Sequence, residues 1–236
     1  MKKKTVLICG AGGFIGGHLV ADLLKEGKYN LVCADIKPQE YWFQHFDQSK
    51  NFSLDLKEYE NCLKVSKGVD YIFNLACNMG GMGFIENNKA ECMLSVLVNT
   101  NLLRAAVVNE IEKYYFSSSA CVYNGRKQSK IFIPGLKEED AYPAMPEDGY
   151  GWEKLFSERM CRHFTEDFNL ETRVARYHNI YGPLGTFDGG REKAPAALSR
   201  KIANAKINKI DKIEVWGDGE QTRTFAFIDD CVDGTL

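Results

Sequence analysis

The chain has 236 residues, 44% of them hydrophobic and 12% aromatic, and a formal net charge of −2. This length allows one large buried core, and the balanced charge argues against a protein that binds nucleic acid or a membrane surface. Glycines interrupt the apolar run after the basic start too early for a signal peptide, and we expect that no segment approaches the roughly 18 apolar residues that a membrane helix needs.

Eight cysteines are scattered along the chain, without a CxxC pair and without paired His and Cys spacing. Cys9 and Cys33 lie in strand-like runs, where reduced, buried thiols are common. We therefore expect no disulfide framework, no metal site and a cytoplasmic location.

Strand-like and helix-like segments alternate along most of the chain. Helical spacing predicts four helices, the first stopping at Gly27. The expected strands cover 4–9, 30–35, 51–56, 69–77, 113–123 and 171–177, and the expected helices cover 14–27, 59–68, 88–111 and 150–168. This alternation predicts an α/β fold with a doubly wound parallel sheet of Rossmann type.

The texture of the sequence changes after Pro183. A glycine-rich loop leads into a helix that begins near "KAPAAL", and residues 212–230 read as two short strands around a turn. We therefore divide the chain into a Rossmann domain over 1–176 and the start of a smaller lobe over 177–236.

The stretch "GAGGFIG" follows the first strand and opens the first helix. Gly10 permits a tight turn, Gly13 lets the backbone approach a pyrophosphate, and Gly16 allows close packing of the helix on the sheet. Phe14 and Ile15 begin the helix, whose free N–H groups would meet the phosphates. This context predicts a dinucleotide-binding turn.

An acidic residue ends the second strand. Asp35 would accept a hydrogen bond from the ribose 2′-hydroxyl and would repel a 2′-phosphate, which favours NAD over NADP. Asp55, with Leu56 beside it, is a candidate contact to the adenine, although a plain surface acid explains Asp55 nearly as well.

The stretch "YGWEK" places Tyr150 and Lys154 on one face of a predicted helix. Tyrosine, with an ordinary pKa near 10, becomes a useful base only when a neighbouring cation favours the phenolate. Such a tyrosinate could take a proton from a substrate hydroxyl. Ser119 ends the fifth strand, at the sheet edge where ligands bind in such folds, and would hydrogen-bond the oxygen of that hydroxyl. The alternative is a packed tyrosine beside a snorkelling lysine, and the glycine turn favours the catalytic interpretation.

Together with "NLAC", "SSSACVY" and "ARYHNIYGP", these motifs resemble the extended short-chain dehydrogenase/reductase family, whose members act mostly on nucleotide sugars. Within it, "NMGGMGFI", "DGYGWEK", "GREKAPAA" and "VWGDGEQTRTF" resemble the GDP-mannose 3,5-epimerases. The resemblance implies bound NAD, a GDP-hexose substrate and a homodimer. Such enzymes continue well beyond the position of residue 236, so the second lobe, a substrate-binding one, is expected to be truncated here.

The resemblance also implies an acid/base pair, Cys121 and Lys193. Oxidising C4 of a hexose to a ketone makes the protons at C3 and C5 acidic, and a thiol and an amine could then remove and return protons on opposite faces. From position alone, Cys121 would be a buried thiol at a strand end and Lys193 a lysine facing phosphate or solvent.

The same resemblance implies contacts to the substrate from further along the chain. These candidates are Gly80, Gly81, Gly83, Asn179, Glu192, Lys201, Gln221 and Arg223. Two other functions stay open: another NAD-dependent nucleotide-sugar 4-epimerase or dehydrogenase, and a truncated NAD-binding protein without catalysis.

Overall fold

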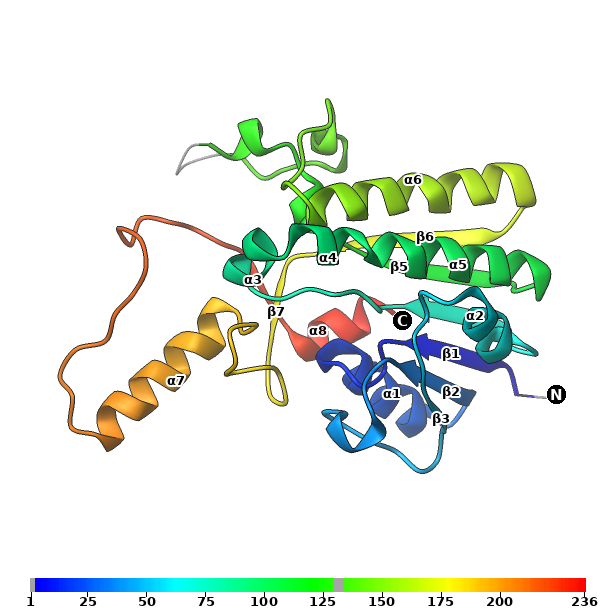
Figure 1. The fold of residues 1–236 in the computed structure, drawn as a ribbon, viewed down its shortest axis with the longest axis horizontal. Coiled ribbons are helices and arrows are strands. Elements are labelled where there is room, and N and C mark those ends of the chain that lie inside the picture. Colours follow the sequence, from blue (N-terminus) through cyan, green and yellow to red (C-terminus); the bar gives the residue numbers. More distant parts are fainter. Residues whose placement is uncertain (1–2, 130–133) are drawn as a thin grey trace.

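The computed structural model describes residues 3–129 and 134–236. Its centre is a six-stranded parallel sheet in the order β3-β2-β1-β4-β5-β6 (Figure 1). The strands are β1 Thr5–Cys9, β2 Asn30–Asp35, β3 Lys50–Ser53, β4 Tyr71–Asn74, β5 Lys113–Ser119 and β6 Glu171–Tyr177. The predicted doubly wound α/β fold is confirmed.

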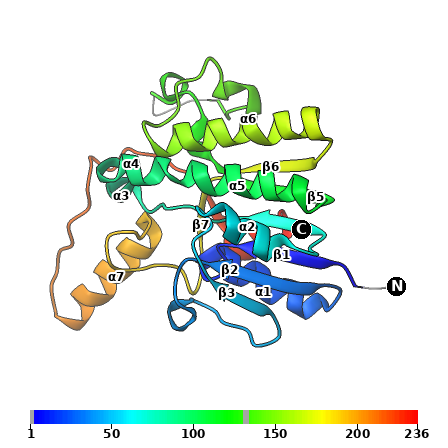
Figure 2. The ribbon, with the colours of Figure 1, turned by 45° about the vertical axis from the view of Figure 1, so that its right-hand side comes forward.

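Helices cover both faces of this sheet. The helices α1 (Phe14–Glu26) and α8 (Ile228–Asp233) pack on one face, and α2 (Tyr59–Ser66), α5 (Ser95–Val108) and α6 (Tyr150–Phe168) pack on the other (Figure 2). In β1, alternate side chains enter the two opposing cores, because successive strand residues point to opposite faces. The glycine stop of α1 is also confirmed, since Gly27 has a φ of 66°.

The helix expected over 88–111 consists of two parts, α4 (Lys89–Met93) and α5, which meet at Leu94. The stretch Lys89–Val108 is long and apolar enough to cross a membrane by length and composition, so the expectation that no segment approaches this limit was wrong. Half of the stretch is buried, and α5 packs between α2 and α6. It therefore has the character of a core helix.

Three strands, β3, β4 and β5, end earlier than expected, and side-chain hydrogen bonds mark the ends of β4 and β5. The chain leaves β4 at Asn74, whose side-chain oxygen accepts the Ala76 N–H at 3.2 Å. The chain leaves β5 at Ser119, whose hydroxyl oxygen accepts the Cys121 N–H at 3.2 Å and caps a short 3-10 turn. Both side-chain bonds replace ladder bonds, and they bend the chain over the carboxyl edge of the sheet.

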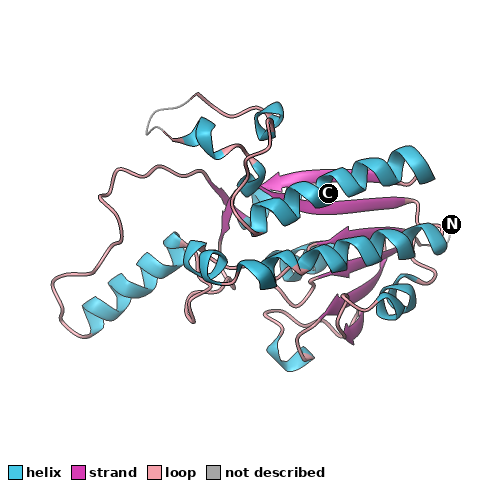
Figure 3. Ribbon diagram, turned by 45° about the horizontal axis from the view of Figure 1, so that its top comes forward, coloured by secondary structure: helices cyan, strands magenta, loops and turns pink. Residues whose placement is uncertain are grey.

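The last sixty residues contain β7 (Asn179–Tyr181), α7 (Ala194–Ile207) and β8 (Phe225–Phe227), and β7 pairs with β8 in a small parallel sheet. The expected strand pair within 212–230 was wrong: β8 is the strand there, and its partner is β7. Residues 212–223 are largely exposed and form a loop. This loop and α7 project from the body of the protein (Figure 3).

After this projection the chain returns to the Rossmann core. Ile180, Ile228 and Val232 are buried in the same apolar cluster as the first residues of α1 and β1. In contrast, α7 has no buried residue. The domain boundary at 176/177 stays a prediction.

Candidate active site

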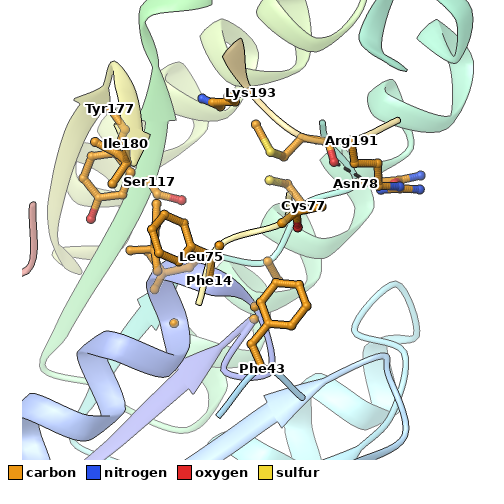
Figure 4. A pocket seen from close by; sticks show the side chains of 18 of the residues that line it. Phe14, Phe43, Leu75, Cys77, Asn78, Ser117, Tyr177, Ile180, Arg191 and Lys193 are labelled. Atoms are coloured by element: carbon orange, nitrogen blue, oxygen red, sulfur yellow. Dashed lines mark hydrogen bonds between the residues drawn. The ribbon is translucent and has the colours of Figure 1, made fainter. Parts of the chain in front are cut away.

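A cleft of about 1500 Å³ lies at the carboxyl ends of the parallel strands (Figure 4). Open parallel sheets bind ligands at this edge. Most of the predicted cofactor and catalytic residues line the cleft: Gly10, Gly13, Phe14, Ile15, Gly16, Asp35, Asp55, Leu56, Ser119, Tyr150 and Lys193.

The glycine turn forms one end of the cleft. Gly10 has a φ of +83°, and a Cβ there would lie 3.0 Å from the backbone of Leu75 and Ala76. A Cβ on Gly16 would lie only 2.2 Å from the Gly10 carbonyl oxygen. The turn therefore brings bare backbone, followed by the N-terminus of the thirteen-residue helix α1, to the cleft. This cradle fits a pyrophosphate.

Asp35 is buried at the end of β2, where it faces the same cleft. Its carboxylate accepts the Gly12 N–H at 3.0 Å and the Lys37 N–H at 2.9 Å. These two bonds fix the carboxylate beside the glycine turn, as a ribose-binding acid requires.

Tyr150 and Lys154 lie on one face of α6, as predicted. The Lys154 side chain is 1% exposed, with its Nζ atom 5.5 Å from the centroid of the Tyr150 ring and 4.6 Å from that of Phe116. Lys154 therefore lies beneath the tyrosine and does not line the cleft.

The pKa of Tyr150 differs from the expectation. Burial raises the pKa of Tyr150 well above its usual value, the thiols of Cys77 and Cys121 raise it further, and a hydrogen bond with Ser119 acts in the opposite direction. In the protein alone, burial therefore outweighs the neighbouring ammonium. Deprotonation of Tyr150 would need further positive charge in the cleft.

Cys121 and Lys193 come from distant parts of the sequence but are close enough to interact electrostatically. Lys193 lines the cleft, whereas Cys121 is not among the residues that line it. Burial raises the pKa of the Cys121 thiol, and the charge of Lys193 opposes that rise. Burial lowers the pKa of the Lys193 amine, which favours the neutral form that can accept a proton. Cys121 also packs in one apolar cluster with Tyr150 and Cys77. A phenol, a thiol and an amine thus gather in one place.

Several of the expected substrate residues lie elsewhere or have other partners. Asn179 donates to the Thr224 carbonyl at 3.0 Å, and Lys201 donates to the Glu214 carbonyl at 2.7 Å. Gln221 and Arg223 lie exposed on the projecting loop, and the structure does not bring them to the cleft.

The glycines of "MGGMG" are not equivalent. A Cβ at Gly81 would lie 2.6 Å from the Glu192 carbonyl oxygen, and one at Gly80 would lie 2.9 Å from Phe84. A Cβ at Gly83, on α3 (Met82–Asn87), would meet nothing within 4 Å. Gly80 and Gly81 therefore approach the loop before α7, while Gly83 has no close neighbour within the part of the chain that the structure describes.

Known proteins resemble this chain both in sequence and in fold. Residues 6–236 match the NAD dependent epimerase/dehydratase family. The chain belongs to this family. It is 48% identical over 236 residues to GDP-mannose 3,5-epimerase 1 of Oryza sativa subsp. japonica. The match covers 100% of this chain and 61% of the rice protein. The chain thus spans about three fifths of the curated relatives that it matches.

Solved structures agree with the fold. The UDP-glucose 4-epimerase of Thermotoga maritima, solved with UDP-glucose, superposes with a TM-score of 0.85 at 21% identity, over 98% of this chain and 72% of that chain. The UDP-glucuronic acid 4-epimerase of Bacillus cereus, solved with UDP-glucuronic acid and NAD, gives a TM-score of 0.77 at 27% identity, over 98% and 71%.

The cofactor of this family is NAD. The glycine cradle, the helix N-terminus and the buried Asp35 fit that dinucleotide. Over 3–129 and 134–236, no group of three His, Cys, Asp or Glu side chains could hold a metal ion.

Several further polar residues of the cleft were not predicted as site residues, among them Cys77, Asn78 and Arg191. Cys77 and Asn78 follow β4, and Arg191 precedes Lys193 by two positions. The rule that identified Ser119, a polar side chain after the carboxyl end of a strand, would also have found Cys77 and Asn78. Arg191 stands out only through the partners it meets in space.

Proposed function

We propose that this chain binds NAD and a GDP-hexose and acts as a GDP-mannose 3,5-epimerase. The observation that carries this proposal is that Tyr150 and Lys193 line the same cleft as the glycine turn, while Cys121 packs against Tyr150 and interacts electrostatically with Lys193. A simple 4-epimerase needs one acid/base group at C4, whereas here two more lie close by, Lys193 in the cleft lining and Cys121 packed against Tyr150. The 48% identity to the rice enzyme supports the same choice.

NAD, when bound, would supply a hydride acceptor for C4 of the sugar and the donor that restores the alcohol. Tyr150 would accept the proton of the C4 hydroxyl and later return it. Ser119, which interacts with Tyr150, would orient that hydroxyl. The buried Lys154 beneath the ring would favour the phenolate once the proton begins to move.

The C–H bonds beside a C4 ketone are acidic because the resulting carbanion is an enolate. Cys121 and Lys193 would act on those bonds from two sides, one group removing a proton while the other delivers one. Their pKa values suit this exchange, since burial raises that of the thiol and lowers that of the amine. Inversion at both C3 and C5 then needs no further group.

Deuterium exchange tests the proposal directly. The purified protein is incubated with GDP-mannose and NAD in D₂O, and the sugar is followed by NMR. We expect deuterium at C3 and C5 and galactose- or gulose-configured product. A 4-epimerase or a dehydrogenase would incorporate no deuterium at these carbons, and a non-catalytic NAD-binding protein would leave the sugar unchanged.

Cys121→Ala separates the two halves of the reaction. The variant should lose exchange at the sugar carbons and keep measurable C4 oxidation, seen as NADH absorbance. Normal epimerisation by this variant would show that the cysteine assignment is wrong.

We also propose that the protein forms homodimers in the cytoplasm. Apolar side chains are exposed on the neighbouring helices α5 and α6: Leu97 is 42% exposed, Trp152 43% and Phe156 51%. Such a surface suits a second copy of the chain. All eight cysteines are free, which fits a reducing compartment. Light scattering of the wild-type protein and of Trp152→Glu tests the dimer, since the variant should be monomeric.

A further inference from the structure

Two loops from distant parts of the chain meet over the acid/base end of the cleft. The first loop, residues 78–81, leads from β4 into α3, and the second, residues 186–193, precedes α7. Arg191 joins them: its Nη1 atom donates to the Asn78 Oδ1 atom at 2.9 Å and to the Met79 carbonyl oxygen at 3.1 Å. The Asn78 contact is drawn as a dashed line in Figure 4.

Two more contacts complete this junction, which we call the arginine clasp. The Arg191 guanidinium lies 3.8 Å from the centroid of the Phe84 ring, at stacking distance. The Gly81 N–H donates to the Arg191 carbonyl oxygen at 3.1 Å. A planar guanidinium can stack and donate two hydrogen bonds at once, which a lysine ammonium cannot.

The glycines of the first loop make this close contact possible. Because a Cβ on Gly81 would lie 2.6 Å from the Glu192 carbonyl oxygen, a larger residue would push the two loops apart. The sequence interpretation assigned Gly80 and Gly81 to the sugar, whereas here they contact the loop that carries Lys193.

The clasp holds a segment that the core does not hold. Lys193 is the N-cap of α7, and α7 has no buried residue. On the helix side, Glu192 accepts a hydrogen bond from Arg200 at 2.7 Å. Two sets of contacts therefore hold the segment around Lys193: the bond between Glu192 and Arg200, and the arginine clasp. Of these two, the clasp connects the loop of Lys193 to the segment that follows β4.

We propose that Arg191 is a positioning residue for Lys193. Resting on the acid/base role given to Lys193 above, the clasp sets the amine beside Cys121 and keeps water from it. Arg191 itself transfers no proton.

The groups around Lys193 define how its titration should respond. Cys121 and Cys77 face the amine with potential negative charge, and His178 is close enough for the lysine charge to lower the pKa of the imidazole. Burial is the largest influence on Lys193 and lowers its pKa. Opening the clasp admits water, so the pKa of Lys193 should move up toward its ordinary value.

Labelling measures this effect without any turnover. The acetylation rate of Lys193 is followed by mass spectrometry as a function of pH in the wild-type protein and in Arg191→Ala. We expect the midpoint of the labelling curve to move to higher pH in the variant. An unchanged curve would overturn the proposal whatever the protein catalyses.

Exchange kinetics supply the functional arm. Misplacing a catalytic group by about 1 Å costs on the order of 100-fold in rate, so Arg191→Ala should slow deuterium exchange by about that factor while NAD affinity stays unchanged. The limb of the pH profile that Lys193→Ala abolishes should move to higher pH. If the wild-type protein itself shows no exchange, the proposed function fails and the labelling result still decides on the clasp.

Two further variants exclude a simple loss of charge. Gly81→Ala keeps Arg191 but forces the loops apart, and it should reproduce the pH shift. Arg104→Ala is the matched control, because Arg104 also stacks on a ring, that of Tyr59 at 4.1 Å, and donates to an asparagine, Asn101, outside the cleft. An altered Lys193 titration in Arg104→Ala, or a normal one in Gly81→Ala, would contradict the clasp.

Discussion

Replacing Gly16 by alanine tests whether the glycine turn is as tightly packed as the cofactor cradle requires. The new Cβ would lie 2.2 Å from the Gly10 carbonyl oxygen and 2.9 Å from the Ala11 Cα atom. Both are backbone atoms, and the turn is fastened to the sheet by the 2.7 Å hydrogen bond from the Gly10 N–H to the Ala34 carbonyl oxygen. No flexible side chain can move aside, so the start of α1 must shift.

The magnitude follows from this contact. Overpacking typically costs roughly 1–3 kcal/mol, and we expect Gly16→Ala to lie in the middle of that range, at about 2 kcal/mol. For a chain of this size, about 2 kcal/mol lowers the melting temperature by roughly 4–8 °C. NAD affinity should fall as well, because the helix N-terminus moves relative to the turn.

Gly83→Ala is the matched control. A Cβ there meets nothing within 4 Å, and Gly83 lies inside α3, where alanine is favoured over glycine by up to about 1 kcal/mol. Thermal denaturation and calorimetric NAD titration of both variants measure the contrast. If Gly16→Ala has the same melting temperature as Gly83→Ala and binds NAD normally, the packing argument is wrong.

Three other predictions concern buried charge, cofactor choice and pH. Lys154→Met should destabilise the protein by about 3–5 kcal/mol in urea unfolding, because it leaves the 1% exposed Glu153 carboxylate without its cation 3.7 Å away, and the double variant with Glu153→Gln should recover most of that loss. Asp35→Asn should lower the ratio of the NADP to the NAD dissociation constant, since it removes the negative charge that repels a 2′-phosphate; an unchanged ratio would remove Asp35 from the ribose site. Burial raises the pKa of Cys33 to about 11 and those of Cys62 and Cys161 to about 12, so the folded state keeps protons that the unfolded thiols release near 9, and the free energy of unfolding should fall as pH rises from about 9. Cys62→Ala should make that fall smaller. If the free energy of unfolding of the wild-type protein does not change with pH above about 9, this prediction is wrong.

The Rossmann half could be predicted from the sequence because its signals are local. The run before Gly10, the glycine stop at Gly27 and the spacing of Tyr150 and Lys154 each depend on neighbouring residues, and each lies where predicted. The cofactor end of the cleft follows from the same local rules.

The acid/base end could be predicted only in part. Cys121 and Lys193 came from resemblance, since no local pattern joins residues 72 positions apart in sequence. The contact from Arg191 to Asn78 spans 113 positions, and neither residue has a pattern that predicts the other. Gln221 and Arg223 do not reach the cleft, because residues 212–223 form a loop in which even the apolar Val215 and Trp216 stay exposed.

The small sheet of β7 and β8 has a consequence for how such proteins diversify. The excursion that carries Lys193 departs from β7 and comes back into β8, and bonds from His178 and Asn179 to Thr224 fasten the point of return. A segment whose two ends are pinned side by side can lengthen or shorten at little entropic cost to the framework beneath it. The excursion can thus change in length or sequence while the dinucleotide fold below it stays as it is.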